Sequence, residues 1–169
     1  KLNTANAYYY FGNAFFNQGA SDSSYYYYLK AEKLFLNTNQ YKILADIYLN
    51  KSRIQVRIND VSGAEKSAIL SLKNARKAND KLLEYDALTN LGIVSNETEN
   101  YYDAIDYHNK ALKTSEDNNL NLDYFLREVS LNNLGNTYQK LKKFNDAIFY
   151  FKKALENNRL QKLKPRLYA

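Results

Sequence analysis

Small residues return at fixed places along the chain, and this repetition constrains the fold more than any other feature. Three of the five glycines occupy one position of an apolar helical pattern: Gly12, Gly92 and Gly135. Each is followed at the same interval by an alanine: Ala31, Ala111 and Ala154. Glycine inside a helix costs roughly 1 kcal/mol relative to alanine, so its return at one site indicates that two helices approach closely there. Such self-similarity is typical of helical repeat arrays.

Residues 131–138, which read Leu-Asn-Asn-Leu-Gly-Asn-Thr-Tyr, carry the pattern most fully. A large residue, then Leu-Gly, then Tyr, continued by Ala147, Phe151 and Ala154, resembles the tetratricopeptide repeat. The matching positions near the start are Tyr8, Phe11, Gly12, Phe15, Ser24, Tyr28 and Ala31. The third set is Leu88, Leu91, Gly92, Ser95, Ala104, His108 and Ala111. There Ser95 replaces the usual Tyr and His108 the usual Phe.

A degenerate unit lies between the first and third sets. Ala68, Leu72 and Ala75 fit its second helix. Its first helix, roughly 41–57, fits only with about three extra residues in the turn. Arg53 then stands at the glycine position, so the register of this helix stays open.

The resemblance implies an all-α, right-handed α-solenoid of four antiparallel helix pairs, a tetratricopeptide superhelix. We expect a single array over 1–169, with repeats at about 5–38, 41–80, 82–118 and 121–160. The turn glycines Gly19 and Gly63 are predicted to adopt positive φ after a helix end. Pro165 is predicted to open a further helix, so that 161–169 is the start of a truncated one.

The units are longer than the standard 34 residues, and the chain is rich in Asn, Lys and Tyr. In this it resembles the sensor regions of bacterial tetratricopeptide histidine kinases and transcription regulators. The resemblance implies a protein- or peptide-binding scaffold in bacterial signal transduction. A structural spacer or self-association module is the alternative. We expect a cytoplasmic location, and a periplasmic one stays open because the sequence lacks an initiator methionine.

Residues that could perform catalysis or bind a cofactor are sparse. The chain has no cysteine and a single histidine, His108, and no Gly-rich phosphate loop. His108 occupies a helix-packing position, so we interpret it as a core residue. No run approaches the roughly 18 apolar residues that span a bilayer. We therefore predict no enzyme activity, no cofactor, no metal site and no membrane insertion by this segment.

Charge raises a third functional class, nucleic-acid binding. The net charge is +6, with a basic region at 137–169 and an acidic one at 97–128. The basic cluster comprises Lys140, Lys142, Lys143, Lys152, Lys153, Lys162, Lys164 and Arg166. Such a cluster could neutralise phosphates, but no recognition-helix motif accompanies it. A solvated basic face is the preferred interpretation.

The family binds its partners on the concave surface, which the resemblance places on the first helix of each pair. The expected peptide-binding residues are Tyr9, Asn13, Phe16, Lys51, Asp86, Asn90, Val129, Asn132, Asn133, Asn136 and Lys140. Asn50, Thr89 and Ile93 share these faces. Asparagine amides can grip a peptide backbone through two donors and an acceptor. The clamp that some family members use for a terminal carboxylate lacks its paired cations here, and Asp86 would repel an anion. The alternative is that these residues form an ordinary polar surface.

Overall fold

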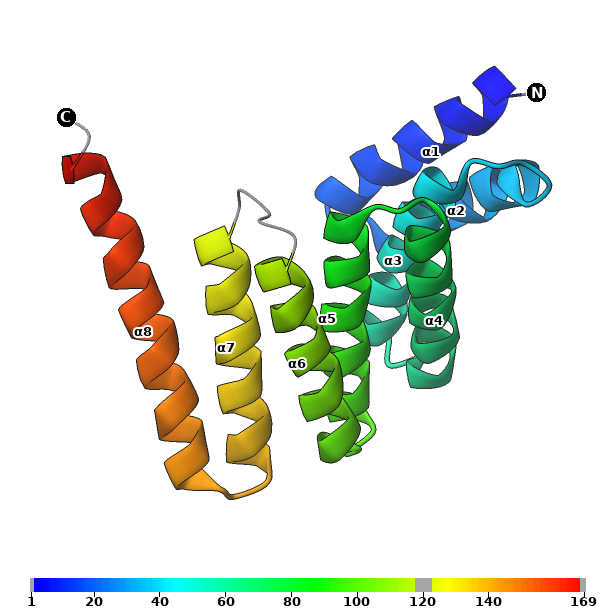
Figure 1. Ribbon diagram of the computed structural model, residues 1–169. Helices are drawn as coiled ribbons and strands as arrows, with labels where there is room; N and C mark the ends of the chain where they lie inside the picture. Colours follow the sequence, from blue (N-terminus) through cyan, green and yellow to red (C-terminus); the bar gives the residue numbers. More distant parts are fainter. Residues whose placement is uncertain (1, 118–122, 168–169) are drawn as a thin grey trace. The chain divides into compact units, whose positions relative to one another are not determined.

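The computed structural model describes the backbone of residues 2–117 and 123–167 and the side chains of 2–116 and 125–157. The described part contains eight helices and no strand, which confirms the all-α prediction (Figure 1). The chain forms two compact units, Lys1–Asn90 and Leu91–Ala169. The boundary falls inside one helix, α5 (Lys81–Glu97).

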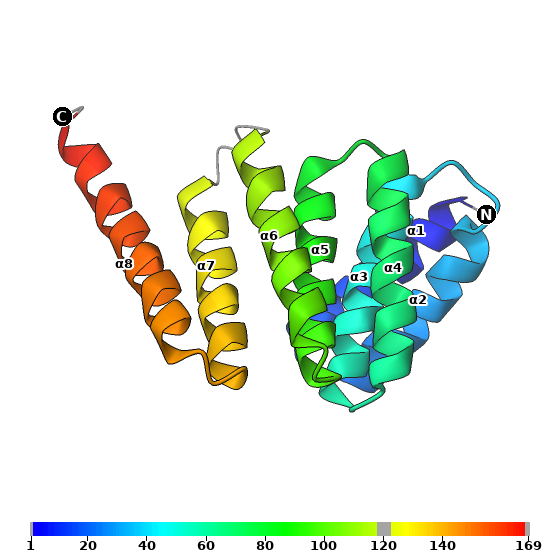
Figure 2. The ribbon, with the colours of Figure 1, turned by 60° about the horizontal axis from the view of Figure 1, so that its bottom comes forward.

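The N-terminal unit consists of two helix pairs and the first part of α5. Helices α1 (Leu2–Asn17) and α2 (Ser21–Phe35) form the first pair, and α3 (Tyr41–Arg57) and α4 (Val61–Lys77) the second. Short turns force each pair to run antiparallel, and α2 also packs on α3 (Figure 2). Their core includes Tyr28, Phe35, Leu44, Ile47 and Ile54.

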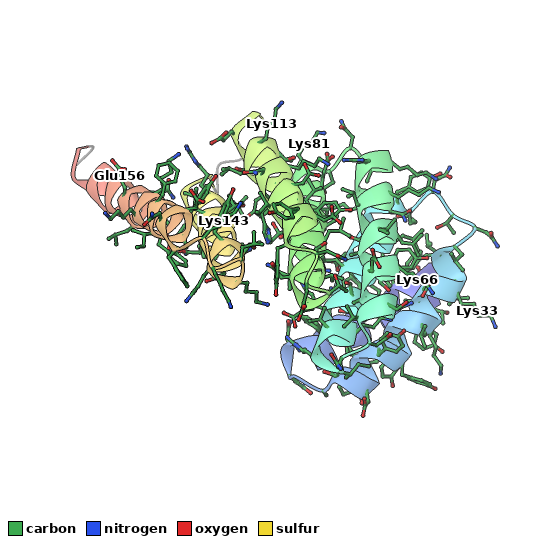
Figure 3. The ribbon with its side chains drawn as sticks, turned by 90° about the horizontal axis from the view of Figure 1, so that it is seen from below. Lys33, Lys66, Lys81, Lys113, Lys143 and Glu156 are labelled. Carbon is green, nitrogen blue, oxygen red and sulfur yellow. The ribbon has the colours of Figure 1, made fainter. Side chains whose placement is uncertain are left out.

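The C-terminal unit contains the rest of α5 with α6 (Tyr101–Asp117), α7 (Asp123–Lys140) and α8 (Phe144–Leu167). Helix α7 packs against both α6 and α8. The predicted limits of the third and fourth repeats, 118 and 121, lie outside the described residues. The second helix of each pair carries exposed cations, among them Lys33 on α2, Lys66 on α4 and Lys113 on α6 (Figure 3).

The expected further helix at 161–169 is wrong as far as the backbone is described. Helix α8 runs without a break from Phe144 to Leu167. No glycine or proline stands between Gly135 and Pro165 to stop it. Pro165 lies in its last turn, where it lacks one backbone hydrogen bond and its ring crowds the preceding turn, two residues before the helix ends.

The close helix approach predicted at the three glycines is confirmed. A Cβ at Gly12 would overlap the ring of Tyr28. One at Gly92 would overlap His108, and one at Gly135 would overlap Phe151. In these three pairs the first helix therefore lies directly on an aromatic ring of the second.

Left-handed residues fix the register that the sequence left open. Gly19, Asn59, Glu99 and Lys142 have φ between 60° and 77°, and each ends the turn within a pair. Gly19, Glu99 and Lys142 all stand the same distance after the packing glycine of their unit. In the second pair, the same distance back from Asn59 leads to Ser52.

Ser52 meets the demands of the glycine position. It is fully buried, and its Oγ donates to the carbonyl of Ala64 on α4 at 2.7 Å. The turn therefore holds no three-residue insertion, and Arg53 is not at the glycine position; both expectations are wrong. Ser71 becomes the equivalent of Ala31 and Ala111, and Ala75, equally buried, lies one turn beyond it.

The two turn glycines behave differently. Gly19 adopts φ +77° as predicted. Gly63 does not have positive φ: it is the third residue of α4, and its N–H donates to the N-cap Asp60 at 3.0 Å. Asn59 takes the left-handed position instead, because asparagine tolerates that conformation better than most residues.

Candidate functional site

Polar side chains of α1, α3 and α5 form a hydrogen-bonded network in the N-terminal unit. The Tyr9 hydroxyl donates to Asp46 Oδ2 at 2.8 Å, and Asn50 Nδ2 donates to the same oxygen at 3.3 Å. Arg53 donates to Asn50 Oδ1 at 3.4 Å, and its second terminal nitrogen lies 3.8 Å from Asp86 Oδ1. Two residues of the predicted peptide-binding set, Tyr9 and Asp86, thus belong to one network. They are joined through Asp46, Asn50 and Arg53 of α3, which that set did not include.

Burial changes the pKa values of the acidic groups in this network. It raises the pKa of both Asp46 and Asp86; Arg53 acts in the opposite direction on each. Burial, reinforced by Asp46, raises the pKa of Tyr9 to about 12. A cavity of about 260 Å³ adjoins the network, lined by Tyr9, Lys42, Ile43, Asp46, Asp80, Leu82 and Leu83. Its carboxylates disfavour an anionic ligand.

Lys51 faces the interior and not this network. Its side chain is 9% exposed and its Nζ lies 2.6 Å from Glu32 Oε2 of α2. The same nitrogen lies 5.4 Å and 5.5 Å from the ring centroids of Tyr25 and Tyr48. The corrected register explains this position: Lys51 precedes the packing site Ser52, whereas Arg53 follows it, as Asn13 follows Gly12.

Other predicted residues of the N-terminal unit also have internal partners. Asn90 is buried and donates through Nδ2 to Ser52 Oγ at 2.6 Å. Asn13 Oδ1 accepts from the Tyr28 hydroxyl at 2.7 Å. The ring of Phe16 lies 4.9 Å from the guanidinium carbon of Arg57. Asn90 and Asn13 therefore stabilise helix packing in this unit.

The C-terminal unit contains a pocket lined chiefly by amides, between α5 and α7. Its volume is about 310 Å³, and its lining residues are Ile93, Asn96, Glu97, Asn133, Asn136, Gln139 and Lys140. It brings together Asn133, Asn136 and Lys140 of the predicted set, with Ile93 of the same face. Val129 and Asn132, predicted on the same helix, do not line it.

Sequence reasoning missed Asn96, Glu97 and Gln139. The signal was available: Asn96 and Glu97 follow Ile93 by three and four residues, and Gln139 and Lys140 follow Asn136 in the same way. Residues at these spacings share one helix face. The stripe of inward-facing first-helix residues therefore continues one turn further than predicted.

Asn96 lies deepest in this pocket. It is 9% exposed, and its Nδ2 donates to Thr137 Oγ1 at 2.9 Å. The Thr137 hydroxyl in turn donates to the carbonyl of Asn133 at 2.8 Å. No described residue donates to Asn96 Oδ1, which is buried. A buried acceptor without a donor costs about 1–3 kcal/mol, so this atom favours a ligand that supplies one.

The pocket is electrically neutral. Its only charged lining residues are Glu97 and Lys140, whose Oε1 and Nζ lie 3.5 Å apart, with side chains 48% and 44% exposed. Such an exposed pair contributes little to stability. It does, however, balance the charge at the mouth of the pocket.

Several lysines of the predicted basic cluster have local partners in the described part. Lys140 pairs with Glu97. Lys143 lies over the ring of Tyr102 at 5.5 Å, and Lys153 over Phe149 at 4.5 Å. The side chains of Lys162, Lys164 and Arg166 lie outside the described residues. Lys140, Lys143 and Lys153 thus have local partners that need no phosphate.

His108 is a core residue, as interpreted from the sequence. Its side chain is fully buried against Gly92, and neither ring nitrogen has a hydrogen-bond partner in the described part. Burial lowers its pKa to about 4, so the ring is neutral near pH 7. Among the described residues, no group of three His, Asp or Glu side chains is placed to hold a metal ion. Nor is any described helix both long and apolar enough to span a bilayer.

Comparison with known proteins agrees with this architecture. Residues 83–159 match the model of the tetratricopeptide repeat family. The apo form of RapI superposes with a TM-score of 0.85 over 96% of this chain at 17% identity, and this chain covers 58% of RapI. MamA gives 0.73 over 95%, at 18% identity and 81% of its own length. No curated protein matches the chain.

A third similar structure is a signal transduction ATPase with numerous domains, carrying a tetratricopeptide repeat sensor, from Pyrococcus horikoshii. Its TM-score is 0.81 over 98% of this chain at 22% identity, and this chain covers 25% of it. The chain thus spans less than two thirds of RapI and a quarter of the ATPase. Residues 83–159 are thus similar to the tetratricopeptide repeat family, and the chain shares the helical fold of these solved structures.

Proposed function

We propose that this chain binds a peptide segment of a partner protein in the pocket between α5 and α7. The observation that carries the proposal is the amide lining around a buried, unsatisfied acceptor at Asn96. Asparagine and glutamine side chains offer donors and acceptors in the mixture that a polypeptide needs. A simple spacer has no need to retain an unsatisfied acceptor in its interior.

The context we propose is signal transduction. The ATPase from Pyrococcus horikoshii carries a tetratricopeptide repeat as its sensor, and 98% of the present chain superposes on that ATPase. A sensory or interaction region would use the pocket to recognise a partner and transmit its presence to the rest of a larger protein. The proposal concerns binding alone and assigns the chain no catalytic step.

Self-association is the second candidate, favoured by exposed aromatic side chains on α1 and α2. Tyr10, Phe11 and Tyr26 are each at least half exposed. The rings of Phe11 and Phe15 lie 5.2 Å and 5.5 Å from Tyr27, so the aromatic residues form one cluster. An exposed apolar surface of this kind is typical of interaction sites.

Selection from a random peptide library on the immobilised 169-residue chain tests the first proposal. Selected peptides should bind the wild type and lose most affinity for the double variant Asn133→Ala, Asn136→Ala. The matched control is Asn109→Ala, an exposed asparagine of α6 that does not line the pocket. Failure to select any peptide, or equal binding by the double variant, would contradict the proposal. Sedimentation of the same chain over a range of concentrations tests self-association.

A further inference from the structure

The side-chain amide of Asn96 has an orientation set by its neighbours. The Thr137 hydroxyl has a single proton, which it donates to the Asn133 carbonyl. Thr137 Oγ1 can therefore only accept from Asn96, so Asn96 must present its NH₂ group to Thr137. Its carbonyl oxygen is left on the other side of the amide, without a donor in the described part of the chain. Asn96, a lining residue of the pocket, thus carries a buried acceptor that has no donor among the described residues.

Depth separates this acceptor from the rest of the lining. Asn96 is buried, whereas Asn136, Gln139 and Lys140 are exposed and form the rim. A peptide main chain lying on the rim does not reach the floor, but a side chain extending from it can. The pocket volume of about 310 Å³ is roughly ten times the share of one liquid water. A side chain of several atoms therefore fits, once a rim residue moves aside to uncover Asn96 Oδ1.

The charged residues of the pocket restrict which kind of ligand side chain can bind. A carboxylate entering the pocket meets Glu97, and an ammonium or guanidinium group meets Lys140. Either charged ligand must also lose hydration without gaining an unpaired counter-charge, which is unfavourable. A neutral group avoids both penalties and leaves the Glu97–Lys140 pair intact.

We infer that the pocket between α5 and α7 selects its peptide through one uncharged side-chain amide, a glutamine or an asparagine. The ligand NH₂ group donates to Asn96 Oδ1, and the ligand carbonyl accepts from the amides of Asn133, Asn136 or Gln139. Glutamine is favoured over asparagine because its longer side chain reaches deeper. This inference rests on the proposed function, since it names the residue that a bound peptide places in the pocket.

Position-scanning peptide libraries, each with one fixed amino acid at one position, test the inference on the 169-residue chain. At one position, glutamine should bind the wild type about fivefold tighter than glutamate or leucine, because one net hydrogen bond changes affinity roughly 2- to 12-fold. Glutamate lacks the donor and is repelled by Glu97, and leucine lacks any polar atom. This comparison needs no variant and so does not depend on how a substitution folds.

The Asn96→Leu variant tests the atom itself. Leucine has a similar shape and removes both the unsatisfied acceptor and the hydrogen bond to Thr137, so the two effects offset and the melting temperature should change little. It should lose the preference for glutamine, while the control Asn109→Leu keeps it. Retained preference in Asn96→Leu, or a wild-type preference for a charged or apolar residue, would overturn the inference and leave peptide binding standing. No binding by any library would overturn both the inference and the proposed function.

Discussion

Single small residues set the packing of each helix pair. Gly12, Gly92 and Gly135 each lie against the ring of the second helix, and Ser52 takes the same role in the second pair. Nineteen residues after these packing sites, on the second helix of each pair, Ala31, Ser71, Ala111 and Ala154 are almost wholly buried. The space at these sites is filled, so they accept no larger side chain without displacement of a helix.

Ala111→Leu tests this packing. The added atoms overfill a site with no exposed surface, and overpacking typically costs about 1–3 kcal/mol. The midpoint of urea unfolding should fall accordingly. Ala7→Leu, the same change at an exposed position of α1, should leave the midpoint nearly unchanged. Equal midpoints for wild type and Ala111→Leu would show that the site is not part of the core.

Residue patterns predicted the packing sites more completely than the lining of the candidate binding pocket, for a physical reason. Packing sites are restricted in size, and the glycines and alanines record that restriction directly. Binding residues depend on register and depth. An error of one residue in the predicted register of the second pair placed Lys51 on the binding face. Lys51 instead pairs internally with Glu32, and Arg53 lies in the polar network. Likewise, the amide of Asn90 is of a type that can bind a peptide, but Asn90 is buried and its Nδ2 donates to Ser52 Oγ.

At the scale of elements, the contact between α5 and α6 differs from the contacts of the first and fourth pairs. A histidine occupies the place of Tyr28 and Phe151, and its two ring nitrogens have no partner in the described part. The neutral ring packs like an aromatic residue, but the protonated ring would place a charge in the interior. Burial is the cause of its lowered pKa.

Stability should therefore depend on pH through His108. Its pKa is about 4 in the folded chain against an ordinary 6.5, so between these values the unfolded state binds more protons. Stability is fully present above pH 6.5 and falls as the pH is lowered towards 4, by up to about 3 kcal/mol.

Urea unfolding of the wild type and of His108→Phe at several pH values measures this dependence. Carboxylates titrate in the same range in both proteins, so the difference between them isolates the histidine. His108→Phe should lose less stability on acidification. Parallel losses would mean that the imidazole is not kept neutral by burial.

At the scale of the whole molecule, the all-α class and the helix pairing could be read from the repeats. The division into two compact units within α5 could not, because it depends on packing, and the nearby Gly92 marks a helix contact with His108 and not a break in the helix. The end of α8 was also misread, since Pro165 can open a helix or lie in the last turn of one. Local signals do not distinguish these two cases.

The neutrality of the pocket predicts how salt affects binding. Affinity for a selected uncharged peptide should change less than about twofold between about 0.05 M and 0.5 M salt, because screening acts on charges. Phosphate contacts by the lysines of α7 and α8 would instead give a steep loss of affinity with salt. A steep loss of affinity with salt would show that the peptide binds the basic surface and not the amide-lined pocket.

The most direct test of the binding site is the NMR response of the side-chain amides to a selected peptide. The NH₂ signals of Asn96, Asn133, Asn136 and Gln139 should shift on addition of the peptide, and that of Asn109 on α6 should not change. If the peptide binds and shifts other signals while the signals of the four pocket amides do not shift, the pocket between α5 and α7 is not the binding site.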